Sequence, residues 1–178
     1  ERNLALLGRC KYRHIQAAVN AAHNGYRILI LPGVYKEEPS RRVSNENPKC
    51  KGDEYEGEEA GTKSYKFQRD CPNVQNLIAV TGDDDDADRR CDDKCNLQIE
   101  GTGRKPQDVQ VVGGGYGLKP GAKLNVFRAD RADGFTLRNL LVQYSDFNNV
   151  YVLETNGFRV DHVISRWSRE YGFLSFAD

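Results

Sequence analysis

An acidic run offers the residue type that binds calcium. The run consists of Asp83, Asp84, Asp85, Asp86 and Asp88. Calcium prefers several carboxylate oxygens at once, but neighbouring aspartates cannot all converge on one ion, and the spacing does not match an EF-hand loop. Because Arg89 and Arg90 follow directly, a solvated and charge-compensated loop is the favoured interpretation. Calcium binding by these aspartates is the alternative.

The five cysteines of the chain are clustered in a way that is typical of disulfides in an oxidising compartment. Four of them lie within the polar stretch 50–95. We predict disulfides between Cys91 and Cys95 and between Cys50 and Cys71, because local loops in a polar segment need a covalent constraint. The fifth cysteine, Cys10, is then a free thiol, or its partner lies outside this chain or in a missing segment.

A zinc site is the alternative interpretation of the same residues. Cys91 and Cys95 have close ligand spacing, Cys71 lies upstream, and His14 or His23 could complete the set of four ligands. Four free thiols bound to one zinc would argue against a secreted protein.

His162 is a candidate for a catalytic base, because histidine titrates near neutrality. It aligns with Asn139 of the preceding repeat, at a turn position where a stacked polar side chain commonly caps backbone groups. Its neighbour Asp161 lies one repeat after Arg138. We predict an interstrand ion pair between these two, worth under ~1 kcal/mol.

The overall composition argues against two classes of partner. Basic and acidic side chains number 26 each, so the formal net charge is zero, and nothing favours nucleic acid or an anionic membrane surface. No apolar run approaches the roughly 20 residues of a membrane-spanning helix. We therefore expect neither a nucleic-acid partner nor a membrane span in this chain.

The predicted elements divide the chain into three parts. An amphipathic helix over 13–25 ends at Asn24-Gly25, and a β-rich run over 27–35 follows. The parts are residues 1–35, an N-terminal cap helix and first strand; residues 36–95, a polar cysteine-containing insertion with one strand near 76–82; and residues 96–178, stacked coils of short strands.

A 23-residue repeat is the strongest signal of organisation in the C-terminal part. Gly134-Phe135 recurs as Gly157-Phe158, and an earlier segment, 125–127, aligns with 149–151 if one loop residue is added. Each coil needs a neighbour to close its core. The predicted inward row is Phe135, Leu137, Leu140, Val142 and Tyr144, above Phe158, Val160, Val163, Ser165 and Trp167.

Two of these segments carry a family resemblance. The sequence Ile-Gln-Ala-Ala-Val-Asn-Ala-Ala, followed by Ile-Leu-Ile-Leu-Pro-Gly-Val-Tyr, resembles the start of pectin-lyase-like proteins, and the repeats 133–139 and 156–162 are similar to those of secreted bacterial β-helix proteins. The resemblance implies an all-β fold class: a right-handed parallel β-helix solenoid with an N-terminal capping helix and a long cysteine-containing insertion. It also implies secretion or display at the cell surface.

The same resemblance suggests a function. Uronate-cleaving lyases of this fold pair an acidic calcium-binding face with an arginine that takes a proton, so Arg128 and Arg166 join His162 as catalytic candidates. The leading expectation is an extracellular protein that binds or processes an acidic polysaccharide. The alternative is a non-catalytic structural or adhesive solenoid that assembles with other chains. We expect the remaining part of the solenoid, or another subunit, to cover its C-terminal end.

Overall fold

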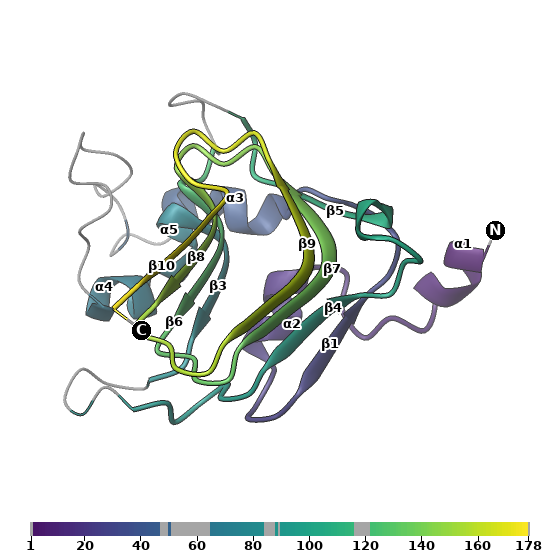
Figure 1. The fold of residues 1–178 in the computed structure, drawn as a ribbon. Coiled ribbons are helices and arrows are strands. Elements are labelled where there is room, and N and C mark those ends of the chain that lie inside the picture. The colour runs from purple at the N-terminus through teal and green to yellow at the C-terminus, as the bar shows by residue number, and fades with distance from the viewer. Residues whose placement is uncertain are drawn as a thin grey trace.

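The computed structural model describes residues 2–46, 50, 65–83, 88, 90–115 and 122–177. The strands in these ranges form two sheets in which every pairing is parallel (Figure 1). The first sheet contains β1 (Arg27–Ile30), β2 (Gly33–Tyr35), β4 (Gln98–Gly101), β5 (Val109–Val112), β7 (Thr136–Gln143) and β9 (Arg159–Arg166). The second contains β3 (Asn76–Thr81), β6 (Asn125–Asp130), β8 (Asn148–Leu153) and β10 (Phe173–Phe176). The helices are α1 (Arg2–Leu7), α2 (Ile15–Asn20), α3 (Glu38–Glu46), α4 (Tyr65–Asp70) and α5 (Pro72–Gln75), and a 3-10 turn spans Pro106–Asp108.

The predicted fold class, an all-β parallel β-helix solenoid, is wrong. The described residues are 20% helical and 38% strand, and a curled, half-barrel parallel sheet with packed helices gives an α/β-like fold. Helix α2 is an integral part of the fold, because the side chain of its Gln16 forms hydrogen bonds with the backbone of the edge strand β3. The Gln16 amide donates to the carbonyl of Ala79 at 3.1 Å and accepts from its N–H at 2.7 Å. A helix side chain thus pairs backbone groups that a further strand would otherwise have to pair.

The last strands of each sheet are offset from their neighbours by 23 residues, as the repeat predicts. Leu137 of β7 pairs with Val160 of β9. The prediction of one additional loop residue between 125–127 and 149–151 is wrong, because Asn125 pairs with Asn148 and not with Asn149. The offset of 23 therefore extends from β6 through β8.

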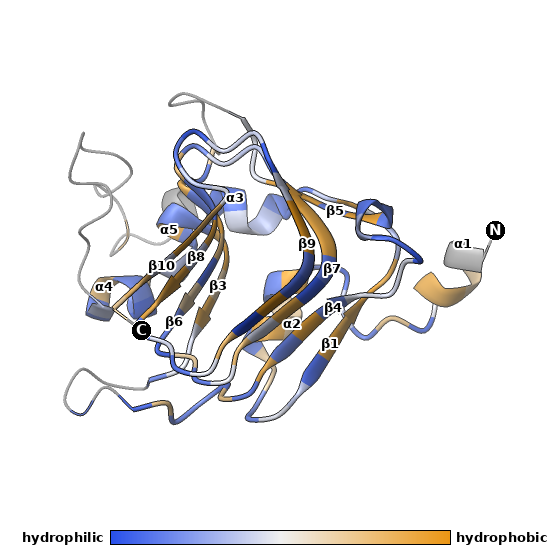
Figure 2. Ribbon diagram, viewed as in Figure 1, coloured by the Kyte–Doolittle hydropathy of each residue, from blue (hydrophilic) through white to orange (hydrophobic). Residues whose placement is uncertain are grey.

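The hydrophobic core lies between the two sheets, and hydrophobic residues run along the strands of both (Figure 2). Four residues of the predicted inward row are buried in it: Phe135, Leu137, Leu140 and Val142. Tyr144 and Trp167 do not point inward as predicted, since their rings stack on each other at 4.7 Å and Trp167 is 50% exposed. Each has a left-handed backbone, with φ of 63° and 52°. This conformation interrupts the alternation of the strand and turns both rings out of the core.

A second left-handed position bends the strands of the first sheet at their middle. Asn139 in β7 has φ of 54°, and His162 occupies the same position of β9 with φ of 51°. The Asn139 amide donates to the carbonyls of Gly101 and Gly103 at 2.8 and 2.9 Å and so caps the backbone, whereas the ring of His162 contacts the Asp161 carboxylate instead. Gly101 must be glycine here, because a Cβ would lie 2.1 Å from the Asn139 carbonyl oxygen.

Candidate functional site

The outer face of β7 and β9 carries three basic side chains that converge on one carboxylate. Oδ1 of Asp161 lies 2.6 Å from Nδ1 of His162. Its other oxygen, Oδ2, accepts from Nη2 of Arg159 at 3.0 Å and lies 3.3 Å from Nε of Arg138. We call Arg138, Arg159, Asp161 and His162 the Asp161 cluster. The predicted ion pair between Arg138 and Asp161 is confirmed.

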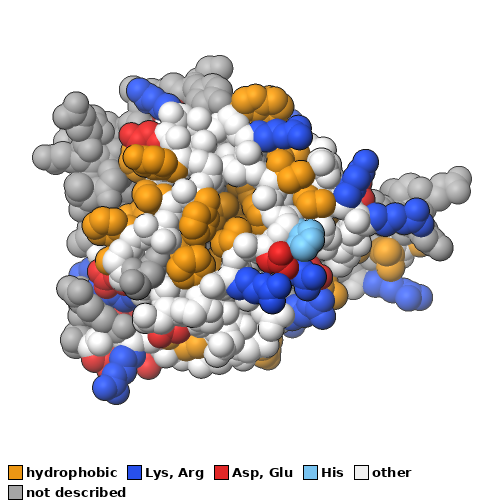
Figure 3. All heavy atoms as spheres, viewed as in Figure 1, with side chains coloured by type: hydrophobic (Ala, Val, Ile, Leu, Met, Phe, Trp, Pro, Cys, Tyr) orange, Lys and Arg blue, Asp and Glu red, His pale blue; other side chains and the backbone are white. Residues whose placement is uncertain are grey.

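Strand alternation and the bend at His162 explain why these groups meet. Leu137 and Val160 face the core, so their successors in each strand, Arg138 and Asp161, face outward at the same level of the ladder. The left-handed backbone of His162 then breaks the alternation, so that consecutive residues present both an acid and an imidazole to solvent. Figure 3 shows basic, acidic and histidine side chains gathered over this face.

The electrostatics of the Asp161 cluster favour a bound anion. The hydrogen bond from His162 holds the pKa of Asp161 below its usual range, and the charges of His162, Arg159 and Arg138 add to this effect. One carboxylate therefore holds three groups that carry positive charge when protonated. His162 and Arg159 are 68% and 67% exposed, so their outer atoms remain accessible to a ligand. Because Nδ1 of His162 is bound to Asp161, Nε2 is the ring atom presented for proton transfer.

Arg128 is not available as a catalytic residue, because it is buried in an ion pair. Its Nε and Nη2 lie 3.1 and 2.6 Å from one oxygen of Asp130, and both side chains are almost fully buried. The strand pairing places Tyr151 beside Arg128, with its ring centre 5.1 Å from the guanidinium carbon. Burial raises the pKa of Asp130 despite the opposing effect of Arg128.

Arg131 joins three segments and was missed by the sequence reasoning. Its Nη1 contacts Oδ2 of Asp83 at 3.0 Å and its Nε contacts Oε2 of Glu154 at 3.0 Å. The ring of Tyr65 lies 3.9 Å from the guanidinium carbon. Burial opposes the charge of Arg131, but its hydrogen bonds to Asp83 and Glu154 raise its pKa. The 23-residue spacing of Arg131 and Glu154 was the signal that could have revealed this contact.

Two aspartates of the predicted calcium run are brought together in space. Asp83 and Asp88 meet Asp92, which lies outside the run, with carboxylate oxygens within 4.8 Å of one another. Three oxygens at this spacing could hold a hard cation. Asp83, however, is buried and already paired with Arg131, which reduces its charge toward a metal. Residues 84–86 of the run lie outside the described residues.

Arg166, the remaining catalytic candidate, lies at the end of β9. It pairs with Gln143 of β7 and is exposed. It stands four positions along the strand from His162, beyond the Asp161 cluster. The structure therefore brings only one of the three catalytic candidates, His162, together with other charged groups that could act with it.

The cysteines form the predicted disulfides, Cys50–Cys71 and Cys91–Cys95, with Cα atoms 5.8 and 5.7 Å apart. The zinc alternative is wrong, because oxidised sulfurs do not provide the thiolates that zinc binds. Cys10 has an exposed free thiol. The two disulfides are consistent with folding in an oxidising compartment.

Among the described residues, no helix combines the length and apolar character needed to cross a bilayer. Comparisons of the chain with protein-family models, with curated proteins and with solved structures found no match.

Proposed function

We propose that this is an extracellular protein that binds an acidic polysaccharide at the Asp161 cluster. The observation that carries the proposal is the convergence of Arg138, Arg159 and His162 on the two oxygens of Asp161, on an exposed face. A guanidinium group matches a carboxylate in a planar, two-point geometry, and its charge does not depend on pH in the physiological range. Asp161 orients these donors before a ligand arrives, which lowers the entropic cost of binding.

The same face favours an extended ligand over a small anion. Arg27 of β1 and Glu100 of β4 form an ion pair two strands away from Asp161, and Arg138 lies between the two acids in the strand register. Charged groups therefore recur across four neighbouring strands, which are about 4.8 Å apart in any sheet. A polymer with regularly spaced carboxylates can contact several of them at once, and its avidity then exceeds that of one contact.

The test is calorimetric titration with oligogalacturonate, with a neutral galactan oligomer of the same length as the control ligand. We expect the variant carrying R138A and R159A to bind oligogalacturonate roughly ten-fold more weakly, since each exposed charge is worth up to about 1 kcal/mol. R104A, which removes an exposed arginine from the connection between β4 and β5, serves as the matched control. Affinity should also fall with added salt, which screens exposed charges.

Two results would contradict this proposal. One is equal binding of the neutral and acidic oligomers, which would show that charge is not recognised. The other is an equal loss from R104A and from the double variant. A failure to bind any member of a broad polysaccharide panel would favour the structural or adhesive alternative.

A second candidate function is cleavage of the bound polymer, and the 2.6 Å contact between His162 and Asp161 favours it. Nε2 of His162 would take the proton next to a uronate carboxylate while the neighbouring arginines neutralise the developing charge. The electron pair of the broken C–H bond then forms a ring double bond as the glycosidic oxygen leaves and takes a proton. We expect new absorbance from an unsaturated uronide, and we expect H162A to abolish it while weakening binding only in part, because Arg138 and Arg159 remain. An unchanged spectrum with wild-type protein would contradict it.

A further inference from the structure

We propose that the protein has a second binding site, a groove for a small amphipathic carboxylate between α2, β1 and residues 7–14. The groove has a volume of about 750 Å³, within the range of about 300–1,000 Å³ of small-molecule sites. None of its lining residues belongs to the Asp161 cluster. This site is therefore independent of the proposed polysaccharide site.

The groove exists because α2 presents small side chains to β1. Val19 of α2 is buried in the core, and the groove is lined by Ala18 of α2 and by Ala21 and Ala22, which follow the helix directly. Alanine fills little of the space between a helix and a strand that lie several ångströms apart, so a hollow remains. The facing strand contributes aliphatic side chains, of which Ile30 is buried and Leu29 is 55% exposed. An apolar ligand body would cover this surface.

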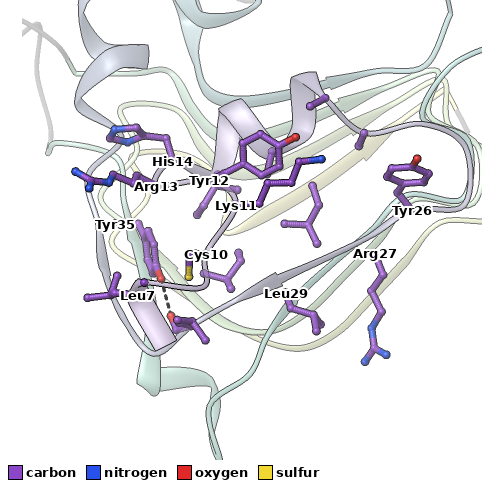
Figure 4. A pocket seen from close by; sticks show the side chains of 18 residues that line it. Leu7, Cys10, Lys11, Tyr12, Arg13, His14, Tyr26, Arg27, Leu29 and Tyr35 are labelled. Atoms are coloured by element: carbon purple, nitrogen blue, oxygen red, sulfur yellow. Dashed lines mark hydrogen bonds between the residues drawn. The ribbon is translucent and has the colours of Figure 1, made fainter. Parts of the chain in front are cut away.

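The rim supplies aromatic rings and one cation directed over the groove. Figure 4 shows Lys11 extending between Tyr12 and Tyr26, whereas Arg13 and Arg27 point away. The Lys11 amino group lies 5.3 Å from the centre of the Tyr12 ring. At the other end Tyr35 donates its hydroxyl hydrogen to the carbonyl of Leu31 at 2.7 Å. Burial, followed by the charges of Cys10 and Glu37, raises the pKa of Tyr35, which keeps this hydroxyl a neutral donor.

The charge balance selects an anionic head group. Among the described residues no aspartate or glutamate lines the groove. Glu37 contacts the start of α2, where its buried carboxylate accepts the N–H groups of Ile15 and Gln16 at 2.9 and 3.1 Å. That carboxylate is committed to the start of the helix. Lys11 is thus the cation left to pair with a ligand, and a single exposed ammonium beside apolar surface suits a monocarboxylate.

Cys10 provides a built-in reporter for the test. It is the one cysteine of five outside the two disulfides, it is exposed, and it lines the groove. We expect decanoate, below its micelle concentration, to slow the reaction of Cys10 with a maleimide at least several-fold. Decanol, which has the same apolar body without the charge, should protect much less.

Variants separate the groove from non-specific protection. Lys11→Ala should weaken decanoate protection roughly ten-fold and leave decanol unchanged, because it removes only the head-group contact. Lys66→Ala, at an exposed lysine of α4, is the matched control and should behave as the wild type. The proposal is overturned if decanoate does not protect Cys10, or if decanol protects equally and Lys11→Ala has no effect.

Discussion

Arg138 and Asp161 are separated by 23 residues in the sequence and by 3.3 Å between Nε and Oδ2 in the structure. Parallel pairing of β7 and β9 with that offset brings them together, and His162 and Arg159 complete the group on the same carboxylate. The proposed polysaccharide site therefore depends on strand register. A shift of one residue would turn Asp161 toward the core.

The pKa of Asp161 should respond to His162 more than to either arginine. His162 provides the hydrogen bond that is the main cause of the lowered pKa, so H162A should move this pKa upward, toward the ordinary aspartate value. R159A should move it upward by less. Carboxyl chemical shifts followed by NMR through an acid titration measure both changes, and an unchanged pKa in H162A would contradict the assigned contact.

The ionisation of Asp161 should make the free energy of unfolding depend on pH. Because the folded-state pKa of Asp161 is lowered, its contribution is present above the ordinary aspartate pKa and is lost as the pH falls through the lowered value. D161N should therefore destabilise the fold slightly at pH 7 and not at all in strong acid. Urea midpoints at the two pH values provide the measurement.

Two phenylalanines one repeat apart should differ in their contribution to stability. Phe135 is 1% exposed inside the core, whereas Phe158 is only partly buried and packs against Phe173 at 5.9 Å between ring centres. F135A should cost about 3–5 kcal/mol and F158A clearly less, because solvent already reaches the second ring. Urea unfolding of both variants decides this, and equal losses would show that the end of the ladder is more covered than the structure indicates.

Removal of Arg128 should destabilise the protein in a pH-dependent way. Its loss leaves Asp130 buried without its partner, which typically costs about 3–5 kcal/mol. Burial already raises the pKa of Asp130, so without Arg128 this carboxyl becomes protonated as the pH falls and part of the loss is recovered. R128A should therefore lie closest to the wild type in mild acid. R159A, at a 67% exposed position, should cost under about 1 kcal/mol at any pH.

The disulfides should be detectable as two specific peptides. Mass spectrometry without reduction should show Cys50 linked to Cys71 and Cys91 linked to Cys95, and thiol titration of the unfolded chain should give one free group, Cys10. Replacing Cys50 and Cys71 by serine opens a loop of 21 residues and should cost about 3 kcal/mol in the chain-entropy model. Exchange of partners between the two pairs would contradict the structure.

The sequence by itself determined the local and periodic features. Apolar spacing predicted the helix that became α2 and the strand run that became β1 and β2. The 23-residue repeat predicted the register of β7 with β9 and thereby the contact of Arg138 with Asp161. Cysteine clustering predicted both disulfides. These features depend on neighbours along the chain or on a constant offset, which a sequence displays directly.

Only the tertiary structure decided the fold class, the burial of particular charges and the groove. The helices that make the fold α/β-like are stabilised by contacts between residues far apart in the sequence, such as Gln16 and Ala79. No constant spacing in the sequence indicates such contacts. The left-handed backbone of Trp167 turns its ring out of the core. The side chain of Arg128 cannot contact a substrate, because Asp130 and Tyr151 pack around it. Burial and backbone conformation are set by all the groups packed around a residue, so no local pattern specifies them.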